Sequence, residues 1–477
     1  MSTLTQAPAA RPPDRLLADE LEASLRDLVA DLPEAQPPRR RGPGRPATVS
    51  ATLLWLGFLL CVLRGFASQR AVWRLLCLHG FWGSPAKPLT ESAIYQRLAR
   101  SVPTAFQTLF ARVTALLVAR YAAVCDLGIA AFATEIYALD HCVLDPVLRK
   151  LKLLRTLRPG DPSLIPGRLA SLFDVRRQLF QRVEFEEDAQ RNVKFGVERL
   201  LEGLAKGTLL LFDLGYFSFP WFDLLTQQGF YYVSRLREKT SWQEIHQLGE
   251  VVELFAGGNA QVRLREAWVY LGKYRADRAA EAVRLVEVCF PHVTYRYITN
   301  VLDPRLLPAA DLVRLYSRRW DIEQAFNLLK THLKLYVLCS GRPNVVQLQV
   351  FASLIIAQVV LALRTDLALR ARADLREISL PLLLECLPRL AADGKDPLHE
   401  LAVHGRRMKI IRPFRGREYV VPEPPPEAYQ YPAARPPPRV PRYAGKDAGP
   451  GRKARASPEK PPRKRRSGWG VDRRKAR

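Results

Sequence analysis

The chain has 477 residues, of which 48% are hydrophobic, so it holds enough apolar material for one large core or two to three smaller ones. Lysine and arginine number 73 against 47 acidic residues, and the net charge of +26 points to a polyanionic partner such as nucleic acid. The longest apolar runs, 51–63 and 350–363, fall short of the roughly 20 residues that span a bilayer, and the N-terminus lacks the pattern of a secretory signal. We therefore expect no membrane partner and a cytoplasmic location.

The two ends of the chain differ in composition from its middle. Residues 1–47 combine leucines at helical spacing with a proline- and arginine-rich stretch, which predicts one short amphipathic helix in a basic segment. Residues 421–477 are rich in proline, lysine and arginine, and we expect a disordered tail there. This tail carries 16 basic and three acidic residues from Arg435 onward, so about half of the excess charge belongs to the rest of the chain.

Residues 48–130 are predicted to form an all-helical region that binds DNA. Apolar periodicity indicates helices over 51–64, 68–80, 90–100 and 103–121. Thr90 suits the N-cap of the third helix, which presents Arg97 and Arg100, residues of a type that contacts phosphates and base edges. The preceding loop is too long for a strict helix-turn-helix, and an ordinary solvated helix face is the alternative interpretation.

Strand patterns begin at residue 131 and predict an α/β fold. Alternating or β-branched stretches lie at 132–140, 169–175, 179–185, 207–213 and 229–237, with a helix expected over 193–204. We take 131–237 as the first part of this α/β core and 293–372 as its second part, which includes a buried helix at 345–364. Between them, residues 238–292 are predicted to form a separate β-rich insertion, and 373–420 a C-terminal helical segment.

The stretch "YSRRWDIEQAFNLLK" predicts an amphipathic helix with a chemically loaded face. At about 100° per residue, four residues fall within an arc of roughly 60°: Tyr316, Arg319, Glu323 and Lys330. An apolar stripe lies beside them and would face the core. Taken alone, Arg319 and Glu323 could be an ordinary i,i+4 surface pair.

Two further carboxylates stand at the ends of predicted core strands. Asp140 ends "ATEIYALD", and Asp213 ends "GTLLLFD" just before a glycine. Asp followed by Gly is also common turn chemistry, so neither residue is diagnostic alone. Phosphoryl transfer by two metal ions needs carboxylates from rigid elements that hold the ions roughly 3.5–4 Å apart. Asp140, Asp213 and Glu323 together would supply such a set.

The order and spacing of these acids resemble the DDE transposases of bacterial insertion sequences. The branch is family four, whose Y-x2-R-x3-E-x6-K signature is complete here as Tyr316, Arg319, Glu323 and Lys330. "FDLGYF" at 212–217 looks like the motif around the second acid, with "FYYVSRLR" and "YRYITN" following in the expected order. The resemblance covers about residues 90 to 365.

One position departs from the family pattern. Members usually follow the first Asp with Gly and then Ser or Thr, whereas Asp140 is followed by His141 and Cys142. Asp145 and Asp174 therefore remain alternatives for the first acid, and an inactive transposase-derived DNA-binding protein remains an alternative function. A second alternative is a metal-dependent nuclease that cuts without strand transfer.

The resemblance implies an RNase H-like fold, a mixed sheet flanked by helices with a β-rich insertion. It implies that Asp140, Asp213 and Glu323 are catalytic and bind two Mg²⁺ or Mn²⁺ ions. It further implies that the DNA phosphates are held by the remaining signature residues: Tyr316, Arg319 and Lys330. Arg235, in "VSRLR", is a further phosphate candidate by its position, and an ordinary surface charge on a strand is the alternative interpretation. The implied partners are double-stranded DNA, as terminal inverted repeats and as target, and a second copy of the chain in a nucleoid-associated complex.

Overall fold

The computed structural model describes residues 29–30, 48–63, 68–80, 84–121, 128–144, 167–186, 197–255, 260–273, 278–335, 338–340, 342–392, 396–413 and 421–440. The helix expected within residues 1–47 lies outside this part of the chain, except for Val29 and Ala30, which are helical. The basic linker before residue 48 and the tail from residue 441 also lie outside it.

The described N-terminal region is helical, and all four expected helical segments are present. They are α2 Ala51–Leu63, α3 Gln69–Arg74 with a π-helical turn η2 Leu75–His79, α4 Glu91–Arg100 and α5 Thr104–Arg120. Trp55 and Phe58 of α2 pack against Phe106 of α5, with ring centroids 6.1 and 5.9 Å apart. The Thr90 hydroxyl accepts a hydrogen bond from the Ala93 N–H at 3.3 Å, which confirms the expected N-cap of α4.

The strands that the structure describes form one mixed sheet of nine, in the order β3-β2-β1-β4-β5-β9-β8-β7-β6. Their bounds are β1 Ile136–Val143, β2 Arg168–Asp174, β3 Leu179–Glu186, β4 Leu209–Phe212, β5 Tyr231–Arg235, β6 Trp242–Phe255, β7 Ala260–Leu271, β8 Ala282–Phe290 and β9 Val293–Thr299. The first three pair antiparallel, whereas β1, β4 and β5 pair in parallel. The α/β class with a mixed sheet is thus confirmed.

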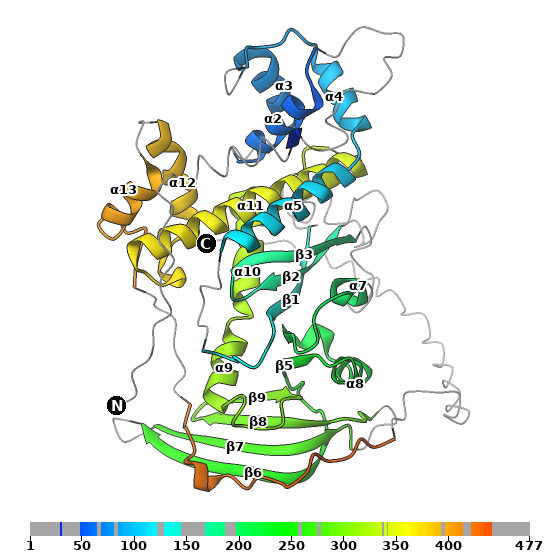
Figure 1. Ribbon diagram of the computed structural model, residues 1–477, viewed down its shortest axis with the longest axis vertical. Helices are drawn as coiled ribbons and strands as arrows, with labels where there is room; N and C mark the ends of the chain where they lie inside the picture. The colour runs from blue at the N-terminus through cyan, green and yellow to red at the C-terminus, as the bar shows by residue number, and fades with distance from the viewer. Residues whose placement is uncertain are drawn as a thin grey trace, which may run out of the picture.

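The sequence suggested that the β-rich stretch 238–292 is separate from the core sheet, but in the structure its strands belong to the same sheet. Strand β9 pairs with β5 on one side and with β8 on the other, so β6, β7 and β8 extend the sheet without a break. Tyr297, Ile298 and Thr299 of β9 each lie opposite a residue of β5 on one side and a residue of β8 on the other. Figure 1 shows the resulting long sheet with β6 and β7 at its lower end.

Residues 421–440 differ from the disordered tail that composition predicted. This strap, with a 3-10 turn η7 Pro426–Ala428, runs along β6 and β7 (Figure 1). The Gln430 N–H donates to the Leu248 carbonyl at 2.7 Å, and the Tyr429 hydroxyl donates to the Glu266 carboxylate at 2.5 Å. Glu266 is 1% exposed and lies 3.4 Å from Arg284, which is fully buried. The strap therefore completes a buried polar cluster, which composition alone does not reveal.

Long helix α11 Pro343–Ala371 forms the core between the two helical regions and the sheet. Figure 1 shows it running beside α5 and past the β3 end of the sheet, with α12 Leu380–Ala392 and α13 Pro397–His404 at its far end. Its length and apolar composition would suit a membrane span, but 89% of its most apolar window is buried inside the protein. Gln358 binds both the N–H and the carbonyl of Phe180 and so joins α11 to edge strand β3.

Four shorter elements of the described fold are α7 Val197–Leu201, η4 Leu214–Tyr216, α8 Phe219–Gln227 and η6 Leu375–Glu377, and the helices of the signature segment are described below with the site. The helix expected over 193–204 is α7, and the structure describes it only from residue 197. Segment η4 follows β4 directly and contains the glycine and tyrosine of "FDLGYF". It thus begins at the edge of the sheet where the first two acids emerge.

Candidate active site

Asp140 and Asp213 emerge from neighbouring parallel strands at the same edge of the sheet. The β1–β4 ladder ends with Leu139 opposite Phe212, and each acid is the next residue along its strand. Ligands in open α/β sheets bind outside the carboxyl ends of the strands, so this edge is a natural place for a site. The Asp213 carboxylate accepts a hydrogen bond from the Gly215 N–H at 2.8 Å, which fixes the start of η4.

The signature helix is divided into three pieces rather than being one regular helix. Helix α9 Ala309–Ser317 has Arg318 as its C-cap, α10 Trp320–Asn327 follows, and a π-helical turn η5 Leu328–His332 completes the run. At the junction, Arg319 and Asp321 donate their N–H groups three residues back, to Tyr316 and Arg318, at 3.1 and 3.0 Å. These i→i+3 bonds tighten the chain, and the π turn changes the helical phase before Lys330. The common face expected from a regular period is therefore only approximate.

Arg319 lies between two of the three acids. Its guanidinium nitrogens are 3.5 Å from Asp140 Oδ2 and 2.6 Å from Glu323 Oε1. The arginine side chain is 14% exposed, and the two acidic side chains are 18% and 29% exposed. The Arg319–Glu323 pair is thus not the ordinary surface pair of the alternative interpretation, because it also joins α10 to strand β1.

The Asp140 carboxyl lies in a strongly perturbed environment. Its pKa is raised to about 6, chiefly by burial; the carboxylates of Asp213 and Glu323 also raise it, whereas a hydrogen bond from the His141 N–H and the charge of Arg319 lower it. The N–H donates to Asp140 Oδ1 at 2.7 Å. The charges of Asp213 and Glu323 therefore both act on the Asp140 carboxyl.

The structure places Asp174, one of the two alternatives to Asp140, in a different setting. Asp174 is fully buried at the β2–β3 turn, where its carboxylate accepts hydrogen bonds from the N–H groups of Arg176 and Arg177 and pairs with the Arg177 guanidinium at 2.8 Å. It lies opposite Tyr137, whereas Asp140 lies opposite Ser171 further along β1. Asp174 therefore stabilises a turn. Asp145 lies outside the described residues.

The other two signature residues lie beside the acids. The Tyr316 ring packs edge-on against Tyr297 of β9, with centroids 5.3 Å apart, and the Arg319 guanidinium lies 5.8 Å from the Tyr316 ring centroid. Lys330 interacts with the Cys142 thiol. The pKa of this thiol is raised to about 11, chiefly by burial, and Lys330 acts in the opposite direction. Tyr316 and Lys330 therefore approach the site from α9 and from the π turn.

Three predicted DNA-binding arginines lie on other elements. Arg235 ends β5, and its guanidinium lies 5.2 Å from the Tyr295 ring centroid. On α4, Arg97 is half-buried and donates a hydrogen bond to the Val49 carbonyl, whereas Arg100 is exposed at the helix end. Arg97 thus has a structural role that the sequence did not reveal, and Arg100 keeps its side chain on the surface.

Sequence reasoning missed a buried polar network that holds α10 in place. Asp321, two residues before Glu323, binds Arg318 at 2.8 Å and the Gln178 amide at 2.8 Å. Gln178 in turn accepts a hydrogen bond from Arg364 of α11 at 2.9 Å. The i,i+3 spacing of Arg318 and Asp321 was a readable signal, but nothing in the sequence linked them to Gln178 or to α11.

The carboxylate oxygens of the three acids suit a hard divalent cation, but the three side chains do not converge on one point in this structure. Mg²⁺ and Mn²⁺ prefer oxygen ligands, and Asp140, Asp213 and Glu323 offer only those. Among the residues that the structure describes, no three His, Cys, Asp or Glu side chains lie close enough together to hold one ion as they stand. The Arg319 guanidinium, itself a cation, lies between two of the acids. The residues therefore fit such an ion by the chemistry of their oxygen donors, while Arg319 lies between two of them in this structure.

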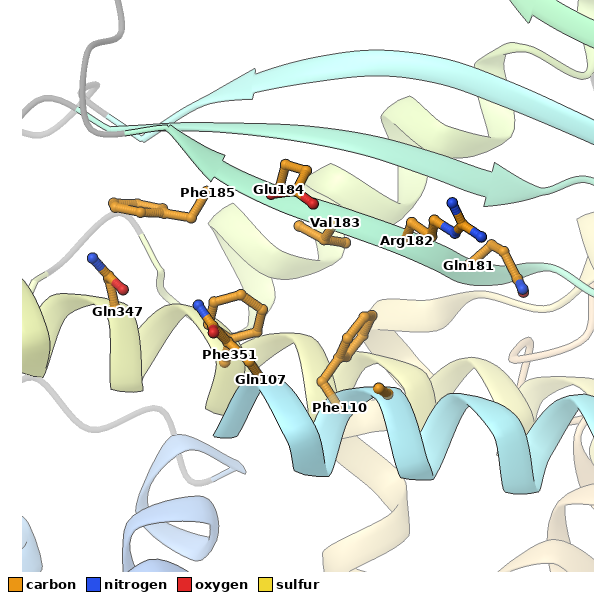
Figure 2. Close-up of a pocket in the computed structure, with 10 residues that line it drawn as sticks. Gln107, Phe110, Gln181, Arg182, Val183, Glu184, Phe185, Gln347 and Phe351 are labelled. Atoms are coloured by element: carbon orange, nitrogen blue, oxygen red, sulfur yellow. The ribbon is translucent and has the colours of Figure 1, made fainter. Parts of the chain in front are cut away.

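A cavity elsewhere in the molecule does not contribute to this site. It measures about 450 Å³ and lies between edge strand β3 and helices α5 and α11 (Figure 2). Phe110 and Phe351 face Val183 across it, with glutamines at its border. Because its lining contains none of the three acids, we do not assign the chemistry to this cavity.

Comparison with known proteins agrees with the chemistry of the site. Residues 162–359 match the family model of the transposase DDE domain, a range that holds Asp213 and Glu323 and begins after Asp140. Transposase y4zB of Sinorhizobium fredii is 27% identical over 180 residues, which are 38% of this chain and 47% of the relative. Transposase InsG for insertion sequence element IS4 of Escherichia coli is 26% identical over 214 residues, 43% and 46% of the two chains. The chain spans about half the length of these curated relatives.

A piggyBac transposase synaptic complex with hairpin DNA has a TM-score of 0.37 and 10% identity, over 83% of this chain and 80% of that one. A similarity this low carries no argument. Residues 162–359 are similar to the DDE domain of transposases. The two relatives, one of them from an IS4 element, are similar to less than half of this chain.

The raised pKa of Asp140 predicts that cation affinity depends on pH. A carboxylate must lose its proton to bind an ion, so Mn²⁺ affinity should weaken as the pH falls through about 6, approaching roughly tenfold per pH unit. Because the folded pKa lies above the ordinary 3.8, the metal-free protein should lose stability as the pH rises from about 4 to 6. Titration of Mn²⁺ from pH 5 to 8 and denaturant unfolding test both, with Asp140→Asn as the control. A constant Mn²⁺ affinity across this range would contradict the prediction.

Proposed function

We propose that the protein catalyses DNA transposition, by metal-dependent cleavage at the ends of an insertion sequence and transfer of the freed 3′-hydroxyl into target DNA. The observation that supports the proposal is the placement of the acids: Asp140 and Asp213 follow paired positions of β1 and β4, and the Arg319 guanidinium lies between Asp140 and Glu323. Tyr316 and Lys330 of the signature lie beside them. If these residues formed only neutral contacts or one surface ion pair, acids from different elements would not need to lie around Arg319.

We also propose that strands β1 to β5 with their helices form an RNase H-like core. Support comes from the strand order 3-2-1-4-5 and from the positions of the acids, on the first strand, after the fourth and on a later helix. The core would comprise residues 131–237 and 293–372, with 238–292 as an insertion that continues its sheet. Residues 48–130 would form the DNA-binding region and 373–420 a C-terminal helical segment.

Asp140, Asp213 and Glu323 would hold two divalent ions, Mg²⁺ or Mn²⁺, which when bound supply Lewis acidity to the attacking and leaving oxygens. The protein's own part is to fix the three carboxylates and to exclude competing geometries. The β1–β4 ladder orients the first two acids, and the Asp321 network orients the third. Movement of Arg319 away from the acids would leave its guanidinium available to a DNA phosphate.

Double-stranded DNA is the proposed partner, both as terminal repeats and as target. Tyr316, Arg319 and Lys330 would hold phosphates next to the acids, and Arg235 would do so from β5. Arg97 and Arg100 belong to the N-terminal region proposed to bind DNA, where the exposed Arg100 is better placed for direct contact. We further propose that two copies act together on DNA, in the cytoplasm and in association with the nucleoid.

The direct test incubates the full chain with a duplex that carries the element's end, a target plasmid and Mg²⁺. We expect single-strand nicks at the end, followed by joined products. Nicks without joining would favour the metal-dependent nuclease. Binding without any nick would favour an inactive transposase-derived protein. This alternative arises because His141 and Cys142 depart from the family pattern after the first Asp. Absence of both binding and nicking would contradict all three functions.

A further inference from the structure

A histidine–tyrosine contact joins the two segments that carry the first two acids. His141 follows Asp140 on β1, and Tyr216 lies at the end of η4, three residues after Asp213. The Tyr216 hydroxyl hydrogen-bonds to His141 Nδ1. The two rings also stack, with centroids 5.1 Å apart and an interplanar angle of 25°.

This contact lies where the backbone ladder between the two strands has ended. The β1–β4 pairing stops at Leu139 and Phe212, directly before the acids. Beyond that point β1 is still held by β2, because Asp140 pairs with Ser171. The segment after Phe212, in contrast, leaves the ladder and turns into η4. The position of Asp213 relative to Asp140 therefore depends on what joins η4 to β1.

The Tyr216 side chain is held in place by burial and by packing, so it can fix the position of η4 relative to β1. Its side chain is 1% exposed, and its ring lies 5.9 Å from the Phe212 ring. Burial lowers the pKa of His141 to about 3, with Arg168 acting in the same direction, and burial raises the pKa of Tyr216 well above its usual value. Both side chains are therefore neutral near pH 7. His141 Nδ1 is engaged by the phenol, which argues against a role for this nitrogen as a metal ligand.

We propose that His141 and Tyr216 are positioning residues that set the separation of Asp140 and Asp213 and so prearrange the carboxylates for divalent cations. The inference rests on the proposed function. His141 occupies the position at which the resembling family usually has glycine, and a glycine could not make this contact. On this proposal, His141 supplies a contact with Tyr216 that glycine could not make, and its presence does not indicate an inactive protein.

The test measures Mn²⁺ binding by the full chain, using the loss of the free-ion electron paramagnetic resonance signal. Tyr216→Phe removes only the hydroxyl, and we expect Mn²⁺ affinity to fall by about 10- to 100-fold, the usual effect of losing a group that orients a metal ligand. His141→Ala should give a similar loss, and the double variant should be no weaker than either one, because one contact is removed in all three. His141→Gln, whose amide oxygen can accept from the phenol, should recover part of the affinity.

Tyr232→Phe is the matched control. Tyr232 is also fully buried, and its ring lies 5.9 Å from the same Phe212 ring, but it belongs to β5. We expect wild-type Mn²⁺ affinity for this variant, even if both phenylalanine variants lower the melting temperature equally. With the end duplex, Tyr216→Phe should raise the Mn²⁺ concentration for half-maximal nicking and leave the rate at saturation within about threefold of wild type.

Two failures are distinguishable. If the wild type binds Mn²⁺ and Tyr216→Phe binds it equally well, the positioning role is wrong and the proposed function is unaffected. Equal losses for Tyr216→Phe and Tyr232→Phe would also overturn the positioning role, because general destabilisation would explain both. If the wild type itself binds no Mn²⁺, the metal-dependent function fails and this inference fails with it.

Discussion

Glu323→Gln should abolish DNA cleavage while the protein still binds the element's ends. The substitution keeps the shape of the side chain but removes the charge that a cation requires. Loss of a residue that hydrogen-bonds to a metal ligand typically lowers metal affinity or activity by about 10- to 100-fold. Loss of a ligand itself should therefore lower the nicking rate by at least roughly 100-fold. The measurement is the single-turnover nicking rate of an end-labelled duplex in Mg²⁺, with binding followed separately by gel shift.

The control for this variant is Glu385→Gln. Glu385 is a half-exposed residue of α12 paired with Arg389, and it carries the same chemical change away from the acids. It should nick at the wild-type rate. End binding by Glu323→Gln should stay within about twofold of wild type. Nicking by Glu323→Gln at the rate of the control would remove Glu323 from the catalytic site.

Arg319→Ala should have opposite effects on the two partners. Without the guanidinium between Asp140 and Glu323, the metal-free site loses a competing cation, so Mn²⁺ should bind several-fold more tightly. If Arg319 reaches a phosphate in the DNA complex, end binding should weaken and the salt slope of the binding constant should fall by about one. Calorimetric Mn²⁺ titration and end binding at several salt concentrations give the two quantities.

Two further variants sharpen the Arg319 experiment. Arg319→Lys keeps the charge but loses the two-pronged geometry, and it should recover most of the salt slope but only part of the affinity. Arg314→Ala removes an arginine with a half-exposed side chain from the preceding helix, where it lies 3.9 Å from Asp311, and so controls for net charge. An unchanged salt slope in Arg319→Ala would contradict its phosphate role, and unchanged Mn²⁺ affinity would contradict the competition.

The sequence predicted the local elements because their signals are local. Alternating apolar residues mark β1 and the strands after it, Thr90 marks the start of α4, and the signature spacing marks Glu323. Each of these signals lies within one short continuous stretch of the sequence. The helical period even placed Arg319 beside Glu323, which the structure bears out at 2.6 Å.

Relations between distant segments could not be predicted in this way. The continuation of the core sheet through β9 depends on which strands pair, and that is decided by residues far apart in the chain. The strap at 421–440 has a composition typical of disorder, yet Tyr429 meets the buried Glu266. A helical wheel likewise shows which side chains share a face but not what they meet, so the contact of Arg319 with Asp140 was missed.

The central claim is that Asp140, Asp213 and Glu323 jointly hold divalent cations. The most direct measurement is anomalous diffraction from crystals of the protein with end DNA and Mn²⁺. Our account predicts anomalous peaks within about 2.5 Å of oxygens of these three carboxylates, with the Arg319 guanidinium withdrawn from between Asp140 and Glu323. Mn²⁺ bound at other acids, or three carboxylates that stay apart in the DNA complex, would contradict it.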